Sequence, residues 1–181
     1  MISNTVTVFR LCLTIPLFLL LALHGPGWIA LSLFLVAGAL DILDGKLARS
    51  LGEASAFGAM LDLIGDRMLT LAAVAGLLTA GVMPIWSAAF AMILVLRDLF
   101  AAAFAEALKG RSAIPPSPLE PLKIAFAFAG LGLAMLPAAA YPNIGLAQDV
   151  LTAALLGLAA ILAIVTLAGY WRATLRTLAQ D

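Results

Sequence analysis

Charge is scarce in this sequence. Asp, Glu, Lys and Arg make up 11% of the 181 residues, and ten acidic residues balance ten basic ones. The basic residues are scattered along the chain, so no surface for nucleic acid is expected. The single cysteine, Cys12, excludes a disulfide framework, and its place in an apolar run favours a packing role. No hydrophilic stretch is long enough to form a soluble domain.

Apolar residues dominate the chain instead. They form 64% of it, and the mean hydropathy of +1.13 is far above that of soluble domains. We therefore expect an all-α integral membrane protein with one membrane domain over residues 1–181. The N-terminal apolar run lacks a small-residue cleavage site and precedes further spans, so it is expected to remain as the first helix. Apolar windows of about 20 residues predict six transmembrane helices, at 5–23, 27–47, 57–80, 84–108, 121–138 and 148–172.

The basic residues set the expected orientation of these helices. The connections at 24–27, 80–84 and 136–149 contain no Lys or Arg, whereas the opposite helix ends hold most of the basic residues. By the positive-inside rule, both termini and the 47–57 and 109–121 loops are expected in the cytoplasm. Aromatic residues near the span ends are expected to anchor the helices at the membrane interfaces; these are Trp28, Trp86, Tyr141, Tyr170 and Trp171.

Four aspartates stand out in the stretch ALDILDGKLARSLGEASAFGAMLDLIGDRM, residues 39–68. Asp41 and Asp44 are three residues apart near the cytoplasmic end of the second predicted helix. Asp62 and Asp66 are four residues apart near the cytoplasmic start of the third. Each pair therefore shares one helix face. Because the short connection makes these helices neighbours, the four carboxylates are expected to converge.

Converging carboxylates with little water around them repel one another, so a positive partner is expected among them. All-oxygen ligation without nearby His or Cys favours Mg²⁺ or Mn²⁺, and four carboxylates are enough to hold two ions. Small residues beside the aspartates leave room for a ligand close to the backbone, namely Gly45, Ala48 and Gly58. The alternative is a set of interfacial salt bridges with neighbouring bases, namely Lys46, Arg49 and Arg67. That alternative explains a single aspartate more readily than four at these spacings.

The fixed residues of this stretch follow the pattern D-x2-D-G-x2-A-R-x8-G-x3-D-x3-D, from Asp41 to Asp66 without a gap or substitution. This pattern resembles the signature of the CDP-alcohol phosphatidyltransferase family. The chain length, the six-helix layout and an N-terminal N-x-V-T-x-x-R pattern ending at Arg10 are also similar to those of its members. The resemblance therefore extends over essentially the whole chain, and the signature is its diagnostic part.

The resemblance implies an enzyme that transfers a phosphatidyl group from CDP-diacylglycerol to a polar acceptor alcohol and releases CMP. It implies a homodimer, two bound Mg²⁺ or Mn²⁺ ions, and an active site at the cytoplasmic face of a cell membrane, here the inner membrane of a bacterium. The metal ligands implied are Asp41, Asp44, Asp62 and Asp66. Asp66 is also the implied general base. The implied CDP site is lined by Asp41, Asp44, Gly45, Ala48, Arg49 and Gly58, with Arg49 facing phosphate.

The expected acceptor is glycerol 3-phosphate, from the chain size, the layout and the N-terminal pattern. Ionisable residues inside a span are functional candidates, and Arg and Lys are the usual partners of phosphate. An anion pocket for the acceptor is therefore expected from Arg97, Arg111 and Lys123. The alternative for Arg97 is a local pair with Asp98 or a side chain that reaches to the interface. Arg10 is expected to be either a phosphate contact or an interfacial anchor.

Two departures bear on the acceptor. Members that resemble phosphatidylglycerophosphate synthases usually carry D-P-x-A-D-K and G-K-x-K-T. This chain has DLIGDR at 62–67 and EPLKI at 120–124, so one lysine survives in the second segment and an acidic residue appears. Serine, inositol phosphate and phosphatidylglycerol, the last as in cardiolipin synthesis, are the alternative acceptors.

Two other classes of function compete with this interpretation. An ion-coupled transporter predicts acids near the bilayer midplane and broken helices at matching places in two repeats, and the sequence has neither pattern. A membrane scaffold that has lost its activity is disfavoured because no aspartate of the signature is missing.

Overall fold

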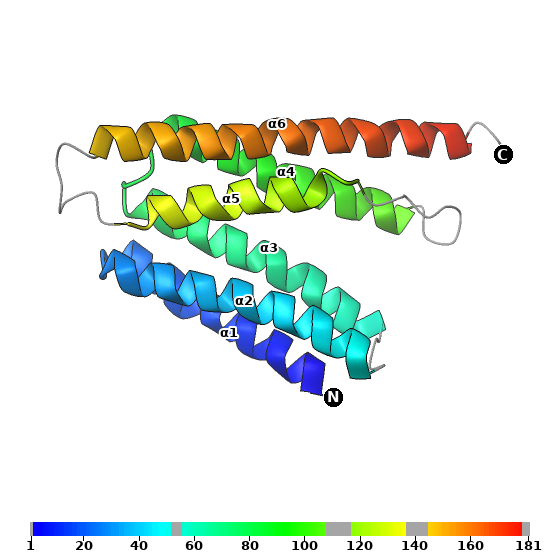
Figure 1. Ribbon diagram of the computed structural model, residues 1–181, viewed down its shortest axis with the longest axis horizontal. Coiled ribbons are helices and arrows are strands. Elements are labelled where there is room, and N and C mark those ends of the chain that lie inside the picture. Colours follow the sequence, from blue (N-terminus) through cyan, green and yellow to red (C-terminus); the bar gives the residue numbers. More distant parts are fainter. Residues whose placement is uncertain (1, 52–55, 108–116, 137–144, 179–181) are drawn as a thin grey trace. The chain divides into compact units, whose positions relative to one another are not determined.

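The computed structural model describes residues 2–51, 56–107, 117–136 and 145–178. These residues form six helices (Figure 1), namely α1 Ile2–Ala22, α2 Gly27–Leu51, α3 Ala56–Thr79, α4 Ile85–Ala107, α5 Glu120–Ala134 and α6 Gly145–Leu178. The prediction of six helices is therefore confirmed. The largest differences are in α2, which continues to Leu51 instead of ending at 47, at the end of α5, which is shorter than predicted, and in α6, which extends beyond 148–172 at both ends.

The chain divides into two compact units. The first comprises Met1–Met83 and Gly132–Gly145, and so contains α1, α2 and α3. The second comprises Pro84–Leu131 and Leu146–Asp181, and so contains α4, most of α5 and nearly all of α6. The four aspartates of the signature belong to the first unit. The residues of the expected acceptor pocket belong to the second.

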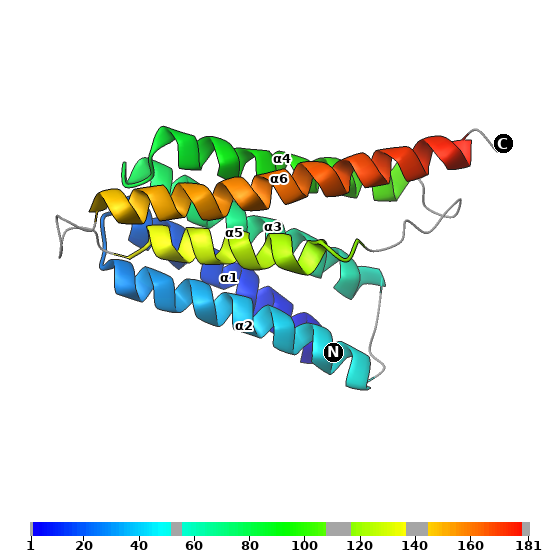
Figure 2. The ribbon, with the colours of Figure 1, turned by 45° about the horizontal axis from the view of Figure 1, so that its top comes forward.

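In the first unit, α1 packs against both α2 and α3, and most extensively against α3. The three helices lie side by side in both views (Figures 1 and 2). Leu17 and Leu21 of α1 and Leu77 of α3 are buried. A Cβ added at Gly76 of α3 would lie 2.7 Å from the Cβ of Leu21, so the absence of a side chain at this glycine lets α1 and α3 approach closely.

Two helices of the first unit, α1 and α3, end in well-defined turns. After α1, the Gly25 N–H donates to the Leu20 carbonyl (2.7 Å) and the His24 N–H donates to the Leu21 carbonyl (3.0 Å). His24 has a φ of 56°, so this is a Schellman motif with a histidine in the left-handed position. The same pair of bonds follows α3, where Gly81 has a φ of 65°. Both turns lie where the sequence predicts connections.

In the second unit, small residues again allow close approach between helices. A Cβ added at Gly157 of α6 would lie 3.4 Å from the ring of Phe90 on α4. One added at Gly130 of α5 would lie 2.9 Å from the side chain of Leu156 on α6. The helix α6 is one continuous element, seen from orange to red in Figure 2.

Two segments are long and apolar enough to cross a membrane, judged by length and composition within the described residues. They are Ile85–Ala102, with a mean hydropathy of 1.7, and Gly145–Arg172, with a mean hydropathy of 2.6. Large apolar side chains on these helices are exposed, among them Ile85 (75%) and Leu146 (77%). The other four predicted spans and the orientation of the termini remain predictions.

Candidate functional site

The four aspartates lie on two helices, as the sequence predicts. Asp41 and Asp44 belong to α2, and Asp62 and Asp66 belong to α3. Both helices pack against α1 and also contact each other. Only the side chain of Asp41 is described, because those of Asp44, Asp62 and Asp66 lie outside the described part of the structure. Convergence of the four carboxylates therefore remains a prediction.

The other residues of the expected CDP site are also on these helices. Gly45, Ala48 and Arg49 belong to α2, and Gly58 belongs to α3. Their surroundings lie outside the described part of the structure. The lining of the CDP site therefore remains a prediction as well.

Arg10 links the three helices of the first unit. It lies on α1, its side chain is 1% exposed, and its Nη1 forms an ion pair with Oδ1 of Asp41 on α2. A Cβ added at Gly65 of α3 would run into the Arg10 guanidinium. Arg10 is thus buried within the first unit, and the choice between a phosphate contact and an interfacial anchor stays a prediction. A charge-assisted bond at a buried position holds Asp41 in one place.

The described residues are compatible with the expected divalent cation. Carboxylates are the ligands that Mg²⁺ and Mn²⁺ prefer, and the site offers them from α2 and α3. Asp41 accepts from Arg10 through one oxygen, and a carboxylate has a second oxygen that can bind a metal. Among the described residues, no three His, Cys, Asp or Glu side chains gather in one place, and three of the four aspartate side chains fall outside this search.

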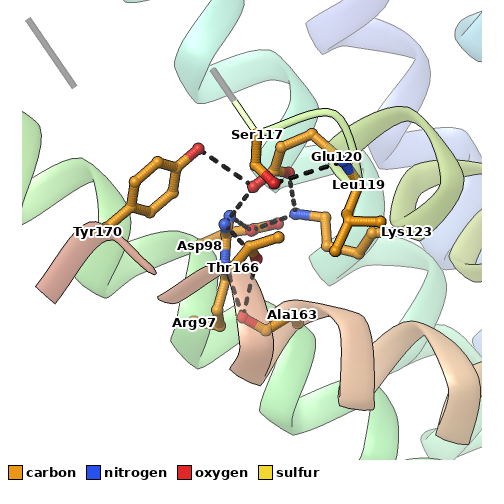
Figure 3. Close-up of polar contacts among 9 residues, drawn as sticks. All are labelled: Arg97, Asp98, Ser117, Leu119, Glu120, Lys123, Ala163, Thr166 and Tyr170. Carbon is orange, nitrogen blue, oxygen red and sulfur yellow. Dashed lines mark hydrogen bonds and ion pairs between the residues drawn. The ribbon is translucent and has the colours of Figure 1, made fainter. Parts of the chain in front are cut away.

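A second polar cluster is centred on Arg97 of α4, which is 6% exposed (Figure 3). Its Nη1 donates to Oδ1 of Asp98 (2.9 Å), and its Nε donates to the carbonyl of Ala163 on α6 (3.3 Å). Its Nη2 donates to Oγ1 of Thr166 on α6 (2.7 Å) and to Oε1 of Glu120 on α5. The guanidinium is thus held by three helices of the second unit.

Lys123 and Tyr170 complete this cluster. Lys123, which is 5% exposed, donates from Nζ to Oδ1 of Asp98 (2.7 Å) and pairs with Oε2 of Glu120 (3.0 Å). The Tyr170 hydroxyl donates to Oε1 of Glu120 (3.3 Å), and its ring centroid lies 5.2 Å from Cζ of Arg97. Two cations therefore face two carboxylates, and the described members of the cluster balance in charge.

Helix periodicity explains how these residues meet. Ala163, Thr166 and Tyr170 recur at three- and four-residue spacing, so they share one face of α6. Glu120 and Lys123 share a face of the first turn of α5 by the same spacing. A glutamate at a helix N-terminus is also favoured by the helix dipole.

The structure brings together two of the three residues expected in the acceptor pocket. Arg97 and Lys123 are joined through Asp98 and Glu120. The local pair of Arg97 with Asp98, which was the alternative from the sequence, is also present in this cluster. Arg111 lies outside the described residues. A role for these residues in binding an acceptor remains a prediction.

Sequence reasoning missed three side chains of the cluster. Glu120 was noted only as an acidic residue, and Thr166 had no assigned role. Tyr170 was expected to be an interfacial anchor, yet it contacts Glu120 and Arg97. The available signal was the four-residue spacing of Thr166 and Tyr170 in the apolar stretch 153–171 of α6, which places two hydroxyls on one face. Trp28 and Trp86 are exposed, at 64% and 72%, and their role as interfacial anchors stays a prediction.

Comparisons with known proteins give concordant matches. The family model of the CDP-alcohol phosphatidyltransferases matches residues 1–177. A Mycobacterium tuberculosis protein named "Probable phosphatidylglycerophosphate synthase" is 33% identical over 142 residues, which cover 75% of this chain and 66% of that protein. A Streptomyces coelicolor protein named "Cardiolipin synthase (CMP-forming)" is 34% identical over 122 residues, which cover 64% of this chain and 54% of that protein.

A third relative, from Cereibacter sphaeroides, is named CDP-diacylglycerol–glycerol-3-phosphate 3-phosphatidyltransferase. It is 33% identical over 117 residues, which cover 62% of this chain and 52% of that protein. The matched segments thus span about half to two thirds of the length of these three relatives.

Proposed function

Because the chain belongs to the CDP-alcohol phosphatidyltransferase family, we propose that it transfers a phosphatidyl group from CDP-diacylglycerol to an acceptor hydroxyl and releases CMP. Glycerol 3-phosphate is the proposed acceptor. Two of the relatives support it by name, one as a phosphatidylglycerophosphate synthase and one as a glycerol-3-phosphate phosphatidyltransferase. The relative named a cardiolipin synthase favours phosphatidylglycerol as the second candidate.

The uninterrupted signature from Asp41 to Asp66, placed on the neighbouring helices α2 and α3, is the observation that carries this proposal. Its four aspartates would hold Mg²⁺ or Mn²⁺. When bound, such ions neutralise the diphosphate of the donor and stabilise the leaving phosphate. The buried Arg10 supports the same site, since it fixes the carboxylate of Asp41.

The proposed reaction assigns a task to each group of residues. The carboxylate of Asp66 accepts the proton of the acceptor hydroxyl. The acceptor oxygen bonds to the phosphorus nearest the diacylglycerol, and the bond from that phosphorus to the bridging oxygen breaks. CMP leaves with the bonding electron pair. Small residues, Gly45, Ala48 and Gly58, leave space for the donor near the backbone, and Arg49 faces its phosphates.

The acceptor is proposed to bind through its phosphate to Arg97, Arg111 and Lys123. Buried Arg and Lys side chains attract phosphate strongly because little water screens them. The reaction is proposed to occur in a homodimer at the cytoplasmic face of a bacterial inner membrane. There the lipid donor arrives within the bilayer and the polar acceptor arrives from the cytoplasm.

CMP release by the purified protein in detergent tests the proposal. The protein is given CDP-diacylglycerol, Mg²⁺ or Mn²⁺, and one acceptor at a time: glycerol 3-phosphate, phosphatidylglycerol, serine or inositol phosphate. We expect release with glycerol 3-phosphate, and its loss on chelation of the metal and in Asp66→Asn. Folded protein that releases no CMP with any of these acceptors would overturn the proposed activity. Release with another acceptor alone would overturn the acceptor.

A further inference from the structure

The carboxylate of Glu120 has an unusual set of partners for a side chain in an apolar protein. Its Oε1 accepts from Nη2 of Arg97 and from the Tyr170 hydroxyl, and its Oε2 pairs with Nζ of Lys123. Figure 3 shows these donors directed at Glu120 from three sides. A guanidinium, an ammonium and a hydroxyl around one oxyanion are the donors that a bound phosphate also uses.

We propose that Glu120 is a built-in competitor, whose carboxylate occupies the position of the acceptor's phosphate and is displaced when a phosphomonoester binds. This inference rests on the proposed function and adds a means of selecting the acceptor. The Glu120 carboxylate occupies the phosphate position until a phosphomonoester binds more strongly and replaces it.

Glu120, rather than Asp98, is the carboxylate that can leave. Asp98 lies within α4 and directly follows Arg97, so its short side chain stays beside the guanidinium. Glu120 is the first residue of α5 and has one more rotatable bond. Both carboxylates reach water, Asp98 at 35% exposure and Glu120 at 21%, so the position at the helix end and the longer side chain are what distinguish Glu120.

Charge decides which ligands can displace Glu120. Among the described residues, the cluster with Glu120 in place has two positive and two negative groups, so a further anion gains less than it would without Glu120. With Glu120 displaced, the described members Arg97, Lys123 and Asp98 carry one net positive charge, to which the proposed contact with Arg111 adds. A phosphomonoester carries close to two negative charges and outcompetes a carboxylate, whereas a phosphodiester carries one. The competition with Glu120 therefore favours a phosphomonoester acceptor over a phosphodiester such as phosphatidylglycerol.

Binding of inorganic phosphate and of glycerol 3-phosphate tests this inference without any catalysis. Affinities are measured by calorimetry on the full chain in detergent, for the wild type, Glu120→Gln and Asp149→Asn. Glu120→Gln removes the competing charge but keeps the shape, so we expect phosphate to bind about tenfold more tightly. Asp149→Asn makes the same charge change on α6, about 20 Å along the helix from Ala163, the nearest cluster residue on α6. We expect this control variant to bind phosphate with wild-type affinity.

A third variant locates the effect. In the Glu120→Gln background, Lys123→Met removes one of the donors that would bind the phosphate in place of Glu120. We therefore expect the gain in phosphate affinity to disappear. In turnover assays, Glu120→Gln is expected to lower the KM for glycerol 3-phosphate and to leave the KM for CDP-diacylglycerol unchanged. Melting temperatures without phosphate show that each variant is folded. Glu120→Asp, which keeps the carboxylate, is the reference for these melting temperatures.

Unchanged or weaker phosphate binding by folded Glu120→Gln would overturn the inference, because Glu120 would then be a structural counter-ion or an acceptor ligand. A gain in affinity that persists after Lys123→Met would overturn it as well, because the phosphate would then bind elsewhere. A failure of the proposed function is distinguishable, since it shows as a lack of CMP release by the wild type. The binding measurements do not depend on that release.

Discussion

Arg10 and Asp41 form an ion pair that joins α1 to α2 at the first aspartate of the signature. The guanidinium is buried, and it lies over Gly65, the residue directly before Asp66 on α3. One side chain of α1 therefore contacts both helices that carry the proposed metal ligands. The N-terminal helix takes part in the construction of the site, beyond any role as a membrane span.

Replacement of Arg10 by methionine is expected to destabilise the protein by roughly 1–3 kcal/mol, since it leaves Asp41 without its buried partner. CMP release is expected to fall at least about tenfold because Asp41 is no longer fixed. Thermal unfolding in detergent and the turnover assay measure the two effects. Arg172→Met is the control, because Arg172 is an exposed arginine and its loss should cost little. Equal effects of the two substitutions would contradict the structural role of Arg10.

Gly65→Ala is expected to push the Arg10 guanidinium away from Asp41. The added Cβ meets the far end of the arginine side chain, which can move only by weakening its buried ion pair. The loss of stability should therefore depend on Arg10, and a double-mutant cycle measures this coupling. In the Arg10→Met background, Gly65→Ala should cost little, as at Gly169, where a Cβ meets nothing within 4 Å. Additive costs would show that Gly65 matters for another reason.

The helices were predictable because long apolar windows separated by Gly, Pro and polar residues are strong signals. Their ends were less predictable. The end of α1 depends on His24 in a left-handed conformation, and histidine is not a usual residue there. The signature aspartates could also be placed on helices, because their spacing is local.

The partners of the buried cations could not be predicted in the same way. Arg97 is conspicuous in an apolar helix, but its contacts with Ala163 and Thr166 join residues 66 and 69 positions apart and depend on tertiary packing. Arg10 likewise gave no sign of its pairing with Asp41. An arginine near the end of an apolar helix is consistent with an interfacial anchor, and only the packing of α1 shows the ion pair.

The two turns with left-handed residues predict opposite responses to substitution. Gly81→Ala should destabilise the protein by about 1–2 kcal/mol, because alanine resists a positive φ and no neighbour compensates. His24→Gly should be neutral or stabilising by up to about 1 kcal/mol, since it relieves the same strain at the corresponding position. Thermal unfolding of both variants measures this contrast. Destabilisation by His24→Gly would show that the histidine side chain contributes more than its backbone strain costs.

Thr166 and Thr152 offer a matched pair on α6. Both are buried, at 3% and 2% exposure, but Thr166 accepts from Arg97 and donates to the Ala163 carbonyl. Within the described residues, the Thr152 hydroxyl has no hydrogen-bond partner. Thr166→Val should therefore cost about 1–3 kcal/mol, because it leaves a buried guanidinium short of an acceptor. Thr152→Val should be neutral or stabilising by up to about 1 kcal/mol, because it removes a polar group that is buried without compensation.

Unfolding of the two threonine variants in the same detergent compares them directly. Thr166→Val should also weaken the binding of inorganic phosphate, since Thr166 helps to hold the guanidinium that the acceptor is proposed to contact. Thr152→Val should leave phosphate binding unchanged. If both substitutions cost the same stability, the hydroxyl of Thr166 adds nothing to the Arg97 cluster. A cost at Thr166 alone, together with weaker phosphate binding, would show that the cluster is both a structural element of the second unit and a site prepared for an anion.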